Sequence, residues 1–221
     1  MKSRVLLELV EEGENLTCEF KRKFSTAEKI AREMIAFANT KGGYLIIGVD
    51  DDKKIIGVES EKAEAELIYD VAKNFCEPPL NVNIDYVEVK GKEVVVVEIF
   101  ESENKPHRIQ DFLNELDVNK SVVTIRVNDK SVQASKEMIR LMKSQSSELS
   151  LKKYSIGTNE KAVFEFLEKY ERISVKELSS YVNISERRAS RTLVKLVRAS
   201  LLFLHTKDNG EEFFTSAQSY F

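Results

Sequence analysis

The sequence predicts an α+β fold in two domains, with a mixed sheet and helices in the first and three helices with a hairpin in the second. Three observations support this. Along the first two thirds of the chain, strand-like apolar runs are interleaved with segments of helical spacing. A polar, serine-rich stretch over 144–150 then interrupts both patterns. Beyond it, three helical segments precede two short apolar runs around an Asn-Gly pair.

The composition is that of a globular protein: 221 residues, 42% hydrophobic and 32% charged, with a net charge of −3. No apolar run approaches the roughly 20 residues of a membrane-spanning helix, and the start of the chain lacks a signal-peptide core, so we expect a cytoplasmic protein without membrane association. Cys18 and Cys76 have no paired spacing, and His107 and His205 are isolated. We therefore expect neither a disulfide framework nor zinc.

The elements of the first domain begin with a short helix that ends near Gly13. Residues 16–24 alternate between apolar and polar side chains and predict a strand, while the apolar spacing over 26–39 predicts a helix. The near-continuous apolar run over 44–49 predicts a buried strand. A turn follows, and 55–58 is expected to start the return strand of a hairpin.

The rest of this domain continues the alternation of helices and strands. The amphipathic helix that follows is expected to stop before Pro78 and Pro79. A hairpin is indicated by Lys90-Gly91-Lys92 between two valine-rich runs. The predicted elements are a helix over 62–76, strands over 82–89, 94–100 and 122–127, and a helix over 135–142.

The second domain shows three helices and a hairpin. Ser174 and Glu177 have the spacing of a capping box at the start of the second helix, and Ser185 is placed to cap the third. The predicted elements are helices over 160–168, 174–181 and 186–199 and strands over 201–206 and 212–215. These are the elements of a winged helix. We therefore expect domains over 1–145 and 157–221, joined by a linker over 146–156.

Cations gather on the third of these helices, mostly away from its apolar stripe. From residue 151 on, the chain has 12 Lys and Arg against 9 Asp and Glu, whereas the preceding part has 22 against 28. A basic helix after a short turn fits insertion into a DNA major groove, with phosphate contacts dominating affinity. Protein contact or dimerisation, with the arginines merely solvated, is the alternative. The candidate nucleic-acid contacts are Arg187, Arg188, Arg191 and Lys195.

The glycine pair Gly42-Gly43 follows a helix, and no Gly-Lys-Ser/Thr comes after it. A phosphate-cradling P-loop precedes its helix, so this pair does not support a P-loop. We interpret it as a tight turn that leads into a strand, and we expect no nucleotide cofactor.

The longer run containing that pair has a family resemblance. It reads Glu-x4-Glu-Phe-Lys from Glu14, then Ala-Phe-Ala-Asn-Thr-x-Gly-Gly-Tyr-Leu-x-Ile-Gly-Val-Asp-Asp from Ala36. With Lys105-Pro106, Thr124-Ile125-Arg126-Val127 and Ser131-x3-Ala134-Ser135, this pattern resembles the AlbA-like nucleic-acid-binding domain of the Schlafen group, over roughly residues 5–143.

The resemblance implies a nucleic-acid-binding domain that in some members is a metal-dependent endoribonuclease acting on tRNA and rRNA. The three carboxylates of those members match Glu14, Glu19 and Asp51, which would be the catalytic residues and the ligands of Mg²⁺ or Mn²⁺. Clustered carboxylates hold such ions, which activate water and stabilise charge on a scissile phosphate. Lys21 and Lys23 are the candidate phosphate contacts of this domain.

Two functions follow from these observations. The first is a divalent-metal-dependent endoribonuclease acting on structured RNA such as tRNA. The second is a non-catalytic transcriptional regulator that reads double-stranded DNA through its winged helix, with the first domain serving dimerisation or sensing. Schlafen cores of the vertebrate type have two related lobes and a zinc site. This chain has one lobe, and we expect a homodimer to supply the second. It offers no ligands for the zinc site.

Overall fold

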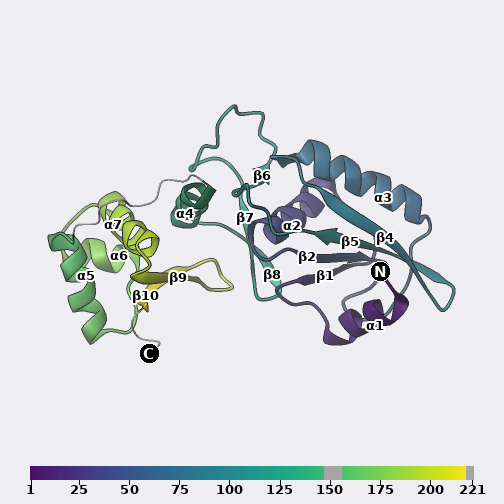
Figure 1. The fold of residues 1–221 in the computed structure, drawn as a ribbon, viewed down its shortest axis with the longest axis horizontal. Helices are drawn as coiled ribbons and strands as arrows, with labels where there is room; N and C mark the ends of the chain where they lie inside the picture. Colours follow the sequence, from purple (N-terminus) through teal and green to yellow (C-terminus); the bar gives the residue numbers. More distant parts are fainter. Residues whose placement is uncertain (147–155, 218–221) are drawn as a thin grey trace. The chain divides into compact units, whose positions relative to one another are not determined.

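The computed structural model describes residues 1–146 and 156–217, so most of the expected linker lies outside the described residues. The chain divides into two compact units, Met1–Ala134 and Ser135–Phe221 (Figure 1). The first contains helices and a mixed sheet, and the predicted α+β class is confirmed. No helix in the described ranges has both the length and the apolar character needed to cross a membrane.

The main sheet of the first unit has four strands in the order β1-β2-β5-β4. Strand β1 pairs with β2 in parallel, while the β2–β5 and β5–β4 pairs are antiparallel. A parallel pair needs a crossover connection, and helix α2 supplies it. The elements are β1 (Cys18–Lys21), α2 (Ala27–Asn39), β2 (Gly43–Ile47), β4 (Val82–Val89) and β5 (Lys92–Ile99).

This sheet has an apolar cluster on each face. Helix α1 (Ser3–Glu12) covers one face, where Cys18 and Phe20 of β1 are buried. Helices α2 and α3 (Glu61–Asp70) cover the other, where Leu45 and Ile47 of β2 are buried. Side chains alternate along a strand, and the register pairs Glu19 with Leu45 and Lys21 with Ile47. The two charged residues of β1 therefore belong to the α2 face.

The end of α2 is tied to strand β7 (Thr124–Val127), which pairs with β8 (Lys130–Gln133). The amide nitrogen of Asn39 donates to the carbonyl oxygens of His107 (2.9 Å) and Thr124 (3.0 Å), and its oxygen accepts from the His107 N–H (2.8 Å). The Thr40 hydroxyl accepts from the backbone N–H of Arg126 (2.9 Å). The Asn-Thr pair of the sequence motif thus fixes β7, and with it Arg126.

The glycine pair forms the tight turn between α2 and β2. Gly43 has a φ of +154°, and a Cβ atom there would lie 2.4 Å from the carbonyl oxygen of Thr17 and 2.7 Å from the Phe37 ring. A side chain cannot occupy this position without moving backbone. Close backbone approach therefore explains the second glycine.

Several predicted elements differ from the observed ones. The return strand over 55–58 is absent: only Ile55 bridges to Val49, because the N–H groups of residues 56 and 57 both donate to the single carbonyl oxygen of Gly48. The predicted strand over 16–24 is limited to β1. The helix over 62–76 is α3 followed by one π-helical segment, Val71–Phe75. Strand β7 lies within the predicted strand over 122–127. Its partner β8 and the short pair of β3 (Cys76–Glu77) with β6 (Arg108–Ile109) were not predicted.

The second unit contains three helices and a hairpin in the predicted order, preceded by α4. Its elements are α4 (Lys136–Ser146), α5 (Thr158–Lys169), α6 (Val175–Tyr181), α7 (Glu186–Arg198), β9 (Leu202–Thr206) and β10 (Glu212–Ser216). Ile173 bridges to Phe214 of β10, and both are fully buried in the core of this unit. The capping box forms, with Ser174 and Glu177 each accepting the other's N–H.

Helix α4 lies in a different unit from the one we predicted. The boundary expected at residue 145 placed this helix in the first domain, whereas the compact units divide after Ala134. A polar contact to α7 explains the difference, since Arg140 of α4 donates to the hydroxyl of the buried Ser190 (2.8 Å).

Candidate nucleic-acid interface

The carboxyl ends of the parallel strands β1 and β2 lie at the same edge of the sheet, which brings Lys21 and the loop after β2 to one end. In that loop Asp50 forms the turn, because one of its carboxylate oxygens accepts from the N–H groups of Asp52 (3.1 Å) and Lys54 (2.9 Å). Asp51 is exposed. Asp50 therefore stabilises the turn, and the exposed carboxylate of Asp51 is available to a ligand.

Glu14 lies close to this edge. One of its carboxylate oxygens accepts from the N–H of Phe20 (3.0 Å). Burial raises the pKa of Glu14, the Phe20 hydrogen bond opposes this, and the negative charges of Glu19 and Asp51 raise the pKa further. The three carboxylates singled out by the sequence therefore share one electrostatic neighbourhood.

Arg126 and Lys21 are cations of this neighbourhood, and the side chain of Arg126 is fully buried. One terminal nitrogen donates to carboxylate oxygens of Glu19 (2.8 Å) and Glu33 (3.2 Å) and to the hydroxyl of Ser131 (3.2 Å). The other donates to the carbonyl oxygen of Asn15 (2.7 Å). A buried guanidinium is costly unless it is paired and hydrogen-bonded in this way.

Glu19 is 7% exposed and has a cation on each carboxylate oxygen, Lys21 on one and Arg126 on the other. A divalent ion of the Mg²⁺ type needs free oxygens from several groups. Across residues 1–146 and 156–217, no group of three or more His, Cys, Asp or Glu side chains is arranged to hold a metal. The residues as arranged do not fit the predicted ion at Glu14, Glu19 and Asp51.

A polar pocket of about 390 Å³ opens beside this cluster and carries three basic side chains. Lys21 lines it together with two residues that the sequence analysis missed, Lys29 and Arg32. Arg32 pairs with Glu28 (2.9 Å), whereas Lys29 is exposed. Their spacing of three on a helix was the available signal, since it puts both on one face. The remaining lining residues are Ser25, Glu33, Thr124, Ser131 and Gln133.

The predicted cations of the second unit differ in their surroundings. Arg187, Arg188 and Arg191 are exposed, and no carboxylate pairs with them in the part of the chain that the structure describes. They occupy the first turns of α7, directly after its cap Ser185. Lys195 lies further along, where its ammonium pairs with the carboxylate of Glu160 at 3.0 Å.

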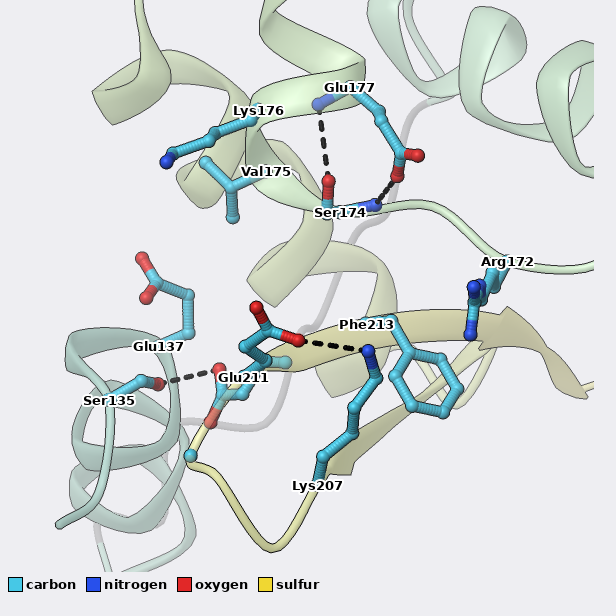
Figure 2. Close-up of a pocket in the computed structure, with 12 residues that line it drawn as sticks. Ser135, Glu137, Arg172, Ser174, Val175, Lys176, Glu177, Lys207, Glu211 and Phe213 are labelled. Carbon is cyan, nitrogen blue, oxygen red and sulfur yellow. Dashed lines mark hydrogen bonds and ion pairs between the residues drawn. The ribbon is translucent and has the colours of Figure 1, made fainter.

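A second pocket, of about 440 Å³, lies in this unit, and Glu212 is among the residues that line it. Figure 2 shows Ser135, Glu137, Lys207 and Glu211 around this pocket. The Glu212 carboxylate accepts from the Ser135 hydroxyl at 2.6 Å. Burial raises the pKa of Glu212 to about 7, and the negative charge of Glu137 adds to the effect. On the pocket wall Lys207 pairs with Glu211 (2.9 Å). Of these residues only Ser135 belongs to the sequence motifs noted above, and Glu137, Lys207, Glu211 and Glu212 carried no predicted role.

Comparison with known proteins identifies the family. Residues 14–135, more than half of the chain, match the family model described as Schlafen, AlbA_2. This chain belongs to the Schlafen AlbA_2 family. The match begins at Glu14 and includes Arg126, so the whole buried charge cluster lies within the Schlafen AlbA_2 domain. The resemblance noted from the sequence motifs is confirmed.

Individual relatives of this Schlafen AlbA_2 protein share part of its length. An uncharacterized ATP-binding protein of Ureaplasma parvum serovar 3 is 33% identical over 87 residues, which is 37% of this chain and 24% of that protein. The chain thus spans about a quarter of that relative's length.

Two solved structures are also similar. The first is the N-terminal domain of a putative ATP-dependent DNA helicase RecG-related protein from Nitrosomonas europaea, with 24% identity over 52% of this chain and 84% of that one and a TM-score of 0.43. The second is the DIP2311 protein of Corynebacterium diphtheriae, with 17% identity over 91% of this chain and 34% of that one and a TM-score of 0.45.

Proposed function

We propose that this protein is a non-catalytic DNA-binding regulator, in which α7 enters the major groove of double-stranded DNA and the Schlafen AlbA_2 domain adds phosphate contacts. The observation that carries the proposal is the group of three exposed arginines in the first turns of α7. In helix-turn-helix proteins the N-terminal residues of the second helix contact base edges. Arginine is the side chain best suited to both guanine and phosphate.

The packing of the second unit supports this role for α7. Ala189, Leu193 and Leu196 are fully buried in the core of this unit. Arg187 and Arg191 are four residues apart, so they share a face of the helix. An anchored helix with one basic face loses little entropy when it binds DNA.

The first unit supplies the second part of the proposal. Lys21 and Lys29 line a pocket that also presents hydroxyl groups, and hydroxyls and cations are common partners of phosphate oxygens. Lys23 is exposed just beyond the end of β1. Contacts at these lysines would strengthen binding without regard to base sequence.

We further propose that the protein binds DNA as a homodimer. A two-fold dimer reads two half-sites whose centres are about 34 Å apart, or a multiple of that distance. Sedimentation velocity of the protein, free and with an inverted-repeat duplex, tests this directly. A monomer in both samples, at concentrations that saturate the duplex, would exclude the dimer.

The test of DNA binding compares the protein with an Arg187→Gln, Arg191→Gln variant, using fluorescence anisotropy of a short labelled duplex over a range of salt concentrations. Losing two phosphate contacts lowers the magnitude of the slope of log K against log salt by about 1.8, and at about 0.15 M salt it weakens binding about 30-fold. Loss of guanine contacts would add to this.

The matched control is Lys161→Gln, Lys169→Gln, which removes the same charge from exposed positions on α5. The control should bind nearly as the parent does. Equal weakening by both double variants would mean that only net charge matters and would reject α7 as the reading helix.

A second candidate function is the metal-dependent endoribonuclease, favoured by the shared electrostatic neighbourhood of Glu14, Glu19 and Asp51. It ranks second because Glu19 is already paired with two cations. The test is incubation with tRNA and Mn²⁺ beside a Glu19→Ala, Asp51→Ala variant. Cleavage by the parent alone would establish this function, whereas cleavage by neither supports the regulator.

A further inference from the structure

The carboxylates of Glu19 and Glu33 are paired with a side chain of the protein, Arg126. We propose that Arg126 is a built-in counterion that takes the place of a divalent ion, so that the Schlafen AlbA_2 domain folds and binds nucleic acid without Mg²⁺ or Mn²⁺. This deepens the proposed non-catalytic function and rests on it. Its test measures metal binding rather than DNA binding, so the two can fail separately.

The contacts of Arg126 fix its guanidinium against the acids. One terminal nitrogen lies within hydrogen-bond distance of both Glu19 and Glu33, and the other donates to the carbonyl oxygen of Asn15. The guanidinium carbon lies 4.7 Å from the centre of the Phe37 ring, a cation–π distance. Among the described residues its Nε is the buried side-chain polar atom that lacks a hydrogen-bond partner. The two carboxylates, the Asn15 carbonyl oxygen and the Phe37 ring together hold this side chain in place.

Hydrogen bonds to α2 and to the residue after it also hold the backbone around Arg126. Its N–H donates to the Thr40 hydroxyl, and the neighbouring Thr124 donates its hydroxyl to the carbonyl oxygen of Arg32 at 2.6 Å. Asn39 accounts for a third link between α2 and β7. These bonds fix the backbone of Arg126 beside α2, which places its side chain next to Glu19 and Glu33.

The charges of the cluster are nearly balanced without a metal. Glu14, Glu19 and Glu33 supply the carboxylates, and Arg126 and Lys21 supply two positive charges. The carboxylates of Glu19 and Glu33 face the Arg126 guanidinium, and Glu19 also contacts the Lys21 ammonium. A divalent ion would meet two resident cations within a buried site, and it would have to displace both from Glu19 before it could bind that carboxylate.

The experiment measures Mn²⁺ binding to the full chain by electron paramagnetic resonance of the free ion and compares thermal unfolding in Mn²⁺ and in EDTA. We expect no ion bound at micromolar free Mn²⁺ and equal unfolding temperatures in the two buffers. If the protein had a specific site, free Mn²⁺ at about 100 times the Kd of that site would raise the unfolding temperature by about 5–10 °C. Such a rise, abolished by Glu19→Gln, would overturn the proposal.

A variant tests the replacement in the opposite sense. Arg126→Gln removes the resident cation and leaves the acids in place, so we expect its unfolding temperature to fall in EDTA and to recover partly in Mn²⁺. The matched control is Arg32→Gln, which removes a cation paired with Glu28 on α2. Its unfolding temperature should be the same in Mn²⁺ and in EDTA. An Arg126→Gln protein that folds but does not respond to Mn²⁺ would overturn the replacement.

If Arg126→Gln does not fold, Arg126→Lys takes its place, since it keeps a positive charge at the centre of the cluster. We expect that variant to fold and to be insensitive to Mn²⁺. Stabilisation of Arg126→Lys by the ion would contradict the proposal, because a resident cation would then not exclude a divalent one.

Discussion

Asn39 is the side chain on which the position of β7 depends most directly, and its loss has a calculable cost. Asn39→Ala removes three hydrogen bonds of 2.8–3.0 Å and leaves the N–H and carbonyl of His107 and the carbonyl of Thr124 without this partner. Both residues are at most 3% exposed, so water cannot readily replace the amide. At about 1 kcal/mol for each bond, plus the desolvation of groups left unpaired, the cost is about 3–5 kcal/mol.

The assay is urea unfolding of the full chain followed by far-ultraviolet circular dichroism, since the chain contains no tryptophan. The matched control is Asn74→Ala, which removes one exposed hydrogen bond to Asp70 and should cost less than about 0.5 kcal/mol. A cost below about 1 kcal/mol for Asn39→Ala would refute the account of Asn39 as the link between α2 and β7.

Three further predictions concern other parts of the fold. Gly43→Ala should destabilise the protein by about 2–4 kcal/mol in urea, because its Cβ would overlap backbone; a neutral effect would disprove the close approach. Ser174→Ala removes the cap of α6 and should cost about 1 kcal/mol, measured against the exposed Ser180→Ala; equal costs would mean that the cap contributes nothing. The pKa of Glu212 is raised to about 7, so its contribution to stability is present below pH 4.5 and lost as the pH rises to 7. Glu212→Gln should therefore reduce the fall in unfolding free energy over that range by about 1–3 kcal/mol, whereas Glu211→Gln should not.

Patterns of short range in the sequence account for most of the fold. Helix α2 and strand β2 follow from their apolar spacing, and the capping box of α6 follows from two residues three apart. The hairpin of β4 and β5 follows from a glycine between two valine-rich runs. Each of these signals is local, so no tertiary contact was needed to recognise it.

The charge cluster could not be predicted in the same way. Arg126 lies 107 residues from Glu19 in the sequence, and the motif containing it carries no local sign that its side chain is buried against an acid. The sequence motif of Glu14, Glu19 and Asp51 indicated a metal site because the sequence does not reveal that Arg126 lies beside Glu19 in the fold. The prediction of a return strand over 55–58 was wrong for a related reason. The N–H groups of residues 56 and 57 both donate to the carbonyl oxygen of Gly48, so the regular hydrogen bonds between two strands do not form.

The boundary between the two units has a practical consequence for preparing the protein in parts. A fragment that begins at Ser135 keeps α4 with α7, so the Arg140–Ser190 hydrogen bond and the Ser135–Glu212 hydrogen bond are retained. A fragment cut after residue 145, as the sequence alone would suggest, loses both and leaves Ser190 and Glu212 open to solvent. Fragments cut at these two places should differ in solubility and in proteolytic resistance, and the shorter one is a poor choice for measuring DNA binding by α7.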